Sequence, residues 1–218
     1  MIAMEKRGSR LVVFAKAPMP GQVKTRLIPT MGAQAAATLH EKLIFHSLAT
    51  TIKAGVGAVE LWCTPSHEHP FFIRCAREFQ VELRKQRGGD IGQRMAHAFY
   101  ETLKISDSVL LIGSDVPCLT CADLKEAMAL LQEKVDAVIS PAEDGGYVLL
   151  GLRRYTSKIF SGISWGTDLV VAQTRTCLRS LGWHWHELST RWDVDRPEDV
   201  QRLILEGFGH LVTKGELI

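Results

Sequence analysis

Short apolar segments alternate with longer amphipathic stretches along most of the chain. Consecutive parallel strands need a crossover connection over one face of their sheet, and a helix usually supplies it. The segments with a strand pattern are 10–15, 58–63, 81–84, 108–113, 136–141, 147–152 and 184–187. The stretches with a helical period are 32–53, 69–78, 91–103, 120–134, 167–181 and 196–207. This alternation predicts an α/β fold in which a mostly parallel mixed sheet lies between two layers of helices.

Two of the helical stretches carry further signals. In 32–53 the large apolar residues recur at a spacing of three to four, which predicts one stripe against the sheet; they are Leu39, Leu43, Ile44, Phe45 and Leu48. Thr120 is a typical N-cap, and Asp123 lies in the first turn that follows it.

Composition narrows the functional classes. The chain has 218 residues, is 46% hydrophobic and carries a net charge of +2, which predicts one globular domain over residues 1–218. This balance lacks the concentrated basic surplus of nucleic-acid binders, and apolar runs such as 109–112 are far shorter than the ~20 residues of a membrane span. Five scattered cysteines favour reduced thiols. Together with the absence of a signal-peptide core, these features predict a cytoplasmic protein with neither nucleic-acid nor membrane partners.

Residues 14–27 leave the first predicted strand as a loop rich in cations. Lys16, Lys24 and Arg26 surround Gly21 in this loop. Backbone N–H groups near a glycine can approach a phosphate, while Lys and Arg neutralise its oxygens. The loop is not a Walker A motif, because no Gly-Lys-Ser/Thr triplet follows Gly21. It is a candidate phosphate-binding loop, and the alternative is a solvated basic turn.

Asp115 follows the predicted buried strand 108–113 within two residues. In open α/β sheets, ligands bind beyond the carboxyl ends of the strands. Mg²⁺ usually takes one or two carboxylates and fills the rest of its shell with water and substrate phosphates. Asp115 is therefore a candidate cation ligand, with a turn or helix-capping role as the alternative.

Two further acidic segments have a structural and a functional interpretation. Asp144, Gly145 and Gly146 can form a tight hairpin turn between strands, or can leave room for an acceptor whose polar groups Asp144 would bind. Asp193 and Asp195 precede a strong helix start at Pro197, which makes Asp195 a candidate helix cap. The same two carboxylates also suit a divalent cation, provided that the fold brings them to Asp115.

Two smaller patterns favour structural roles. Cys118 and Cys121 have Cys-x-x-Cys spacing but lack the second pair that a zinc site needs. Residues 183–186 alternate tryptophan with histidine, as a half-buried strand does, and a His-x-His metal pair is the less favoured interpretation.

Taken in order, these segments resemble the GT-A-fold superfamily of nucleotidyltransferases and glycosyltransferases. More closely, the chain resembles the bacterial radical-SAM/selenodomain-associated transferase family, whose members open with Phe-Ala-Lys-x-Pro-x-Pro-Gly-x-Val-Lys-Thr-Arg-Leu. The matching motifs lie at 14–27, 89–95, 113–117, 143–147, 165–168 and 193–199. More distant relatives are the phospholactate guanylyltransferases and the molybdenum-cofactor nucleotidyltransferases.

The resemblance implies a three-layer GT-A fold and assigns roles to the loops. The nucleotide phosphates are expected at Lys16, Gly21, Lys24 and Arg26. The base is expected at Gly89, Asp90, Gly92 and Arg94. The acceptor is expected at Asp144, Gly145, Gly146, Tyr147 and Asp168. Mg²⁺ or Mn²⁺ is expected on Asp115, completed by Asp195 or Asp193. Lys24, Asp115 and Asp144 are the residues expected to take part in catalysis.

The prediction is a Mg²⁺-dependent enzyme that transfers a nucleotidyl group from a nucleoside triphosphate to a small, anionic acceptor and releases pyrophosphate. An ionised acceptor needs no general base, whereas a hydroxyl would need one, with Asp144 or Asp168 as candidates. The alternative is a glycosyltransferase with a nucleotide-sugar donor, which the many cations between Lys16 and Arg26 favour less. A non-catalytic nucleotide-binding module is a third possibility. The base, the acceptor and the oligomeric state stay open.

Overall fold

The computed structural model describes residues 8–212, and strands and helices alternate along them as the sequence predicts. The strands are β1 Ser9–Lys16, β2 Ala58–Thr64, β3 Glu82–Lys85, β4 Ser108–Gly113, β5 Ala137–Pro141, β6 Tyr147–Leu152 and β7 Trp185–Glu187. The α-helices are α1 Ile28–Ala54, α2 Pro70–Phe79, α3 Ile91–Leu103, α4 Cys121–Gln132, α5 Val170–Ser180 and α6 Pro197–Leu205. Short 3₁₀ turns are η1 Thr25–Leu27, η2 Ser157–Phe160 and η3 Gly209–Leu211. The predicted elements all form, with ends displaced by a few residues at most.

The strands form one mixed sheet in the order β3-β2-β1-β4-β6-β5-β7. β6 runs antiparallel to both of its neighbours, and the other pairings are parallel. The carboxyl ends of β1 and β4 therefore lie at the same edge, where Phe14 pairs with Gly113. β5 also ends at this edge and β6 begins there, because the two form a hairpin.

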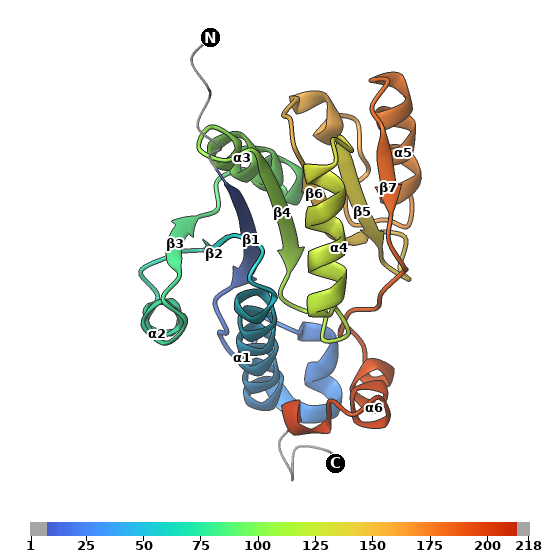
Figure 1. The fold of residues 1–218 in the computed structure, drawn as a ribbon. Helices are drawn as coiled ribbons and strands as arrows, with labels where there is room; N and C mark the ends of the chain where they lie inside the picture. Colours follow the sequence, from blue (N-terminus) through green and yellow to red (C-terminus); the bar gives the residue numbers. More distant parts are fainter. Residues whose placement is uncertain (1–7, 213–218) are drawn as a thin grey trace.

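Helices cover both faces of the sheet (Figure 1). α1, α2 and α4 pack over one face, on a core that includes Leu61, Phe72 and Leu124. α3 and α5 pack with η2 over the other face, on a core that includes Phe99 and Leu178. The predicted three-layer α/β fold is confirmed. Among the described residues, no helix is long and apolar enough to cross a membrane.

The long helix α1 starts earlier than predicted and is interrupted. It begins at Ile28, and Gly32 then adopts a φ of +80° that breaks the regular helix. Glycine reaches this left-handed region without a steric penalty, so the continuous helix follows it. Leu39 and Leu43 pack towards α6, whereas Ile44 and Leu48 pack on the sheet. Phe45 was predicted to face the sheet, but its ring is half-buried against the α2 residues Phe71 and Phe79.

Two predicted helix caps have different outcomes. Thr120 caps α4 in a capping box with Asp123, as predicted. Of the two roles considered for Asp195, the helix cap is wrong, because the N-cap position of α6 is Arg196. The carboxylate of Asp199 accepts hydrogen bonds from the backbone N–H groups of both Asp195 and Arg196. The side chain of Asp195 is thereby left for another partner.

Candidate active site

Four loops that are distant in sequence meet beyond the carboxyl ends of β1 and β4, near α6 (Figure 1). The backbone N–H of Val194 donates to the carbonyl of Asp115 over 2.9 Å, and that of Glu143 donates to Arg191 over 3.0 Å. The loop that carries Asp193 and Asp195 therefore lies directly between Asp115 and the acidic β5–β6 turn. The fold thus supplies the juxtaposition on which a shared cation site depends.

Lys24 is the buried cation of this edge. Its side chain is 5% exposed, and its Nζ lies 2.7 Å from Oδ2 of Asp115. The same ammonium donates to the carbonyl of Val194. The backbone of Lys24 has a φ of +48°, a left-handed conformation that costs free energy in a residue with a Cβ. A strained backbone that holds a buried charge is typical of a functional position.

The carboxylate of Asp115 lies between two basic groups. Its side chain is 35% exposed, and Oδ1 lies 3.3 Å from Nδ1 of the buried His40. Burial raises the pKa of Asp115, but the ammonium of Lys24 and the imidazole of His40 outweigh it and hold that pKa well below its usual range. Asp115 therefore stays ionised throughout the physiological pH range.

Asp193 differs from Asp115 in that the pKa of its carboxyl is raised. Its carboxylate makes no hydrogen bond or ion pair with any residue that the structure describes. Burial and the negative charge of Asp144, with smaller contributions from Asp115 and Asp195, raise its pKa to about 6, while Lys24 opposes the rise. Repulsion among clustered carboxylates is the condition that a bound cation relieves.

Asp195 and the cations Arg26 and Lys16 of the basic loop each have a partner. Arg26, which is 64% exposed, forms an ion pair with Asp195. Lys16 donates to the carbonyl of Gln22 over 2.7 Å and so braces the loop from within. Gly21 adopts a φ of +80° in the turn, a conformation that glycine reaches without a steric penalty. Lys16 thus has an internal partner, which the sequence did not indicate.

The acidic turn forms the predicted hairpin. Oδ1 of Asp144 accepts a hydrogen bond from the N–H of Gly146 over 2.8 Å, and Gly145 has a φ of +87°. A Cβ on Gly145 would lie 2.3 Å from the carbonyl oxygen of Asp168. The space beside Gly145 is therefore filled by the chain at Asp168. The exposed carboxylate of Asp144 stays close enough to Asp193 to raise its pKa.

Residues 88–95 form a well-braced start to α3. Asp90 caps the helix by accepting from the N–H of Gln93 over 2.7 Å, and Nε of Arg94 donates to the carbonyl of Gly88. A Cβ on Gly92 would lie 2.1 Å from Nε1 of Trp165, so only glycine lets that indole pack here. The N–H of Gly89 donates to the side chain of Gln93.

Tyr147, at the start of β6, connects the packed start of α3 and Trp165 to the sheet. Its ring packs edge-on against Trp165, its hydroxyl donates to Sδ of Met95, and burial raises its pKa. Two motifs that were read separately, around Gly92 and Trp165, therefore form one packed unit.

The residues of this edge suit a hard divalent cation, which prefers oxygen ligands. Asp115 has lone pairs beyond the two contacts described. Asp193 has no partner within the described part of the chain, while burial and the neighbouring carboxylates raise its pKa. Among residues 8–212, however, no three His, Cys, Asp or Glu side chains are gathered in a ready-made metal geometry. Asp115 and Asp193 fit the role better than Asp195, whose carboxylate is paired with Arg26.

The other predicted motifs have structural roles. Sγ of Cys118 donates to the carbonyl of Trp192 and Sγ of Cys121 to that of Thr50, so the two thiols have separate partners. Trp183 is buried while His184 and His186 are exposed, which confirms the predicted strand alternation.

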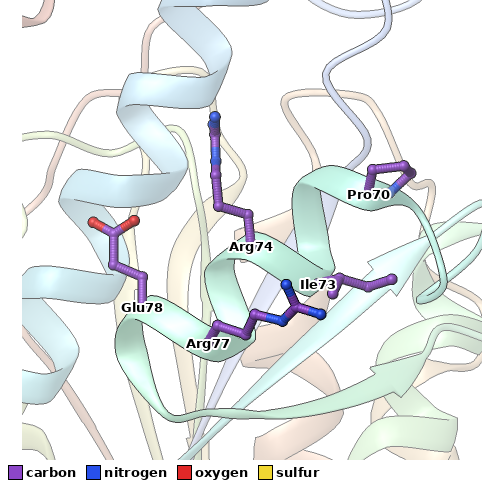
Figure 2. A pocket seen from close by; sticks show the side chains of 5 residues that line it. All are labelled: Pro70, Ile73, Arg74, Arg77 and Glu78. Atoms are coloured by element: carbon purple, nitrogen blue, oxygen red, sulfur yellow. The ribbon is translucent and has the colours of Figure 1, made fainter.

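A hollow on α2 lies outside the edge described. Figure 2 shows that its lining comes from one helix and that Arg74 and Arg77 point in different directions; the lining residues are Pro70, Ile73, Arg74, Arg77 and Glu78. Nη2 of Arg74 lies 2.7 Å from Oε2 of Glu41 on α1. Binding sites gather convergent polar groups, and this hollow lacks them.

His40 is the residue of this edge that sequence reasoning missed. It lies inside the apolar stripe of α1, between residues that pack in the core. A titratable side chain at such a position was the available signal, but only the fold reveals its neighbour Asp115.

Residues 47–167 match the model of a family described as an uncharacterized protein conserved in bacteria, DUF2064. The chain belongs to this family. Among solved structures, a protein of Desulfovibrio desulfuricans G20, titled "putative nucleotide-diphospho-sugar transferase", is 31% identical. It aligns with a TM-score of 0.80 over 88% of this chain and 83% of its own. A search of curated proteins gave no match.

Two more distant structures share the fold. A CMP:2-keto-3-deoxy-manno-octonic acid synthetase complexed with CTP is 13% identical, with a TM-score of 0.58 over 91% of this chain and 99% of its own. Rv0371C of Mycobacterium tuberculosis H37Rv, in complex with manganese, is 16% identical, with a TM-score of 0.54 over 92% and 99%. At this identity they show a common fold: the DUF2064 chain has the architecture of nucleotide-dependent transferases.

Proposed function

We propose that this DUF2064 protein is a divalent-cation-dependent enzyme that transfers a nucleotidyl group from a nucleoside triphosphate to a small, anionic acceptor and releases pyrophosphate. The observation that carries the proposal is the pair of the buried Lys24 with Asp115 at the end of β4, beside the carboxylate of Asp193, which has no partner among residues 8–212. The distant relatives support it, since one was solved with CTP and another with manganese. The resemblance to radical-SAM/selenodomain-associated transferases belongs to the same proposal.

The basic residues of the loop after β1 are assigned to the phosphates. The ammonium of Lys24 has three donors, of which Asp115 and Val194 engage two. Arg26 can turn its exposed guanidinium to a phosphate, because an exposed ion pair such as that with Asp195 is weak. Lys24 neutralises charge near Asp115, and Arg26 grips oxygens at the entrance to the site.

Asp115 and Asp193 are the residues assigned to the cation, Mg²⁺ or Mn²⁺. A bound cation would supply charge neutralisation of the phosphate oxygens, on which phosphoryl-group chemistry mainly depends. Asp115 is suited to it because its low pKa keeps it ionised. The raised pKa of Asp193 makes this residue the one whose ionisation a cation would promote.

The acceptor is assigned to the region around Asp144 and Tyr147, where the exposed carboxylate of Asp144 lies beside Asp193. A phosphate or carboxylate acceptor attacks without losing a proton. Asp144 would then position the acceptor rather than act as a base.

The second candidate is glycosyl transfer from a nucleotide sugar. It is favoured by the 31% identity to the Desulfovibrio protein, which is described as belonging to that class. The same basic loop and carboxylates would serve a diphosphate donor. The products distinguish the two reactions, because glycosyl transfer releases a nucleoside diphosphate.

A thermal-shift screen tests the binding side of the proposal. Nucleoside triphosphates and nucleotide sugars are added with and without Mg²⁺ or Mn²⁺, because a ligand that binds the native state raises its stability. We expect a triphosphate to raise the melting temperature only with the cation in the wild-type protein and in Glu126→Gln, an exposed control on α4. Asp115→Asn should lose the cation-dependent part of the shift. Equal shifts in Asp115→Asn and the control would contradict the site.

A further inference from the structure

His40 connects two parts of the site that are far apart in sequence. Its side chain is 4% exposed on α1. Nε2 lies 3.0 Å from the carbonyl oxygen of Lys16, where the basic loop leaves β1. Nδ1 lies 3.3 Å from Oδ1 of Asp115. One imidazole ring therefore spans the distance between the start of the basic loop and the carboxylate after β4.

The two ring nitrogens of His40 face different acceptors. The carbonyl oxygen of Lys16 and the carboxylate oxygen of Asp115 can only accept, so Nε2 donates to Lys16, and Nδ1 is a donor towards Asp115 when the ring carries hydrogen on both nitrogens. Nδ1 and Oδ1 of Asp115 are both buried, and within residues 8–212 neither has a hydrogen-bonding partner. Buried polar atoms are normally paired, and these two lie 3.3 Å apart.

The two oxygens of Asp115 are thereby distinguished. Oδ1 faces His40, and Oδ2 faces the ammonium of Lys24 at 2.7 Å. A carboxylate with a basic group beside each oxygen has one favoured orientation. On the same face of α1, Oγ of Ser47 donates to the carbonyl of Ser114 over 3.1 Å, a contact that does not involve the carboxylate of Asp115.

We propose that His40 is a positioning residue that fixes Oδ1 of Asp115, so that the other oxygen is presented to the cation and phosphates, and that couples this carboxylate to the start of the basic loop. The inference rests on the proposed function and deepens it. Residues that orient a metal ligand from outside its shell commonly contribute 10- to 100-fold to metal affinity. His40 has the burial and the two fixed partners that such a role requires.

Two substitutions separate the two contacts. The amide nitrogen of Asn lies at about the same distance along the side chain as Nδ1, so His40→Asn keeps a donor towards Asp115. The amide nitrogen of Gln corresponds to Nε2, so His40→Gln keeps a donor towards Lys16. His40→Leu removes both, and Ser47→Ala removes a buried hydrogen bond of the same helix without touching the carboxylate.

The experiment measures Mn²⁺ binding to the full-length variants by the electron paramagnetic resonance signal of free Mn²⁺, beside their melting temperatures. We expect His40→Asn and Ser47→Ala to bind Mn²⁺ nearly as well as the wild type, and His40→Gln and His40→Leu to bind it about tenfold or more weakly. Where turnover is measurable, His40→Asn should also restore the kcat that His40→Leu loses.

Four results overturn the inference. If His40→Gln binds normally and His40→Asn does not, the contact with Lys16 alone matters. If Mn²⁺ affinity follows melting temperature across all variants, including Ser47→Ala, His40 is only a packing residue. If the wild-type protein binds Mn²⁺ and no variant differs from it, the positioning role fails while the proposed function stands; absence of Mn²⁺ binding by the wild type overturns both.

Discussion

Removing the ammonium of Lys24 should destabilise the fold, because it leaves the carboxylate of Asp115 without its ion-pair partner. Lys24→Met keeps most of the side-chain volume but leaves the carboxylate of Asp115 and the carbonyl of Val194 without their donor. Breaking a buried ion pair from one side costs about 3–5 kcal/mol. Asp115 is a third exposed, so water recovers part of this loss, and we expect about 2–3 kcal/mol. In a chain of this size that lowers the melting temperature by roughly 4–12 °C.

A double-mutant cycle in urea at pH 7 measures this coupling. Lys24→Met, Asp115→Asn and the double variant are compared with the wild type. The double variant should be less destabilised than the sum of the single variants by about 1–3 kcal/mol, the range for groups in contact. Additive effects, or a loss below about 0.5 kcal/mol in Lys24→Met, which is the usual range for surface changes, would refute the assignment of a coupled buried pair.

The pH dependence of stability supplies an independent check on the same pair. The pKa of Asp115 is lower in the folded protein than in the unfolded chain, so the unfolded chain binds more protons as the pH falls. The stabilisation is present above the unfolded pKa of about 4 and is lost as the pH falls through the folded value. Lys24→Met should flatten this acid limb.

Three further perturbations have defined outcomes. Asp193→Asn should stabilise the cation-free protein at pH 7 by roughly 1–2 kcal/mol. The pKa of Asp193 is raised to about 6 in the folded protein, so ionisation of this carboxyl destabilises the fold as the pH rises from about 4 to 6. Calorimetric scans at pH 4 and 7 measure the difference, and the same variant should bind Mn²⁺ weakly. Asp195→Asn should change the free energy of unfolding by less than about 1 kcal/mol, since it breaks only an exposed ion pair, and a larger loss in urea titration would restore a structural role for the residue. Gly92→Ala should cost about 1–3 kcal/mol by overpacking against Trp165; Gly89→Ala is the matched control, because its nearest contact would be 3.5 Å away.

The fold was accessible from the sequence because its signals are local. Alternating apolar segments predicted β4, and the polar residues that follow it marked Asp115 as a ligand position at the sheet edge. Thr120 with Asp123 predicted the start of α4. These inferences needed only neighbours within a turn or a strand.

The side-chain partners in the candidate site could not be predicted, because they depend on contacts between segments that are distant in sequence. In the sequence, His40 is part of an apolar helical stripe, and no neighbouring residue indicates that it contacts Asp115. The place of Asp195 before Pro197 made a helix cap one of its two candidate roles, but the carboxylate of Asp199 accepts the hydrogen bonds at this helix start. Lys16 was grouped with Lys24 by composition, whereas its ammonium closes its own loop. Side-chain partners of this kind follow from tertiary structure and not from spacing.

Pyrophosphate release tests the central claim most directly. The purified protein is incubated with each nucleoside triphosphate, Mg²⁺ or Mn²⁺ and a panel of small phosphorylated and carboxylated acceptors, and the products are followed by phosphorus NMR. The proposal predicts pyrophosphate in equal amount to a new phosphoanhydride, or carboxylic–phosphoric mixed anhydride, that contains the α-phosphorus, and loss of both in Asp115→Asn but not in Glu126→Gln. Release of a nucleoside diphosphate from a nucleotide sugar, with no pyrophosphate from any triphosphate, would contradict nucleotidyl transfer and establish the glycosyl alternative.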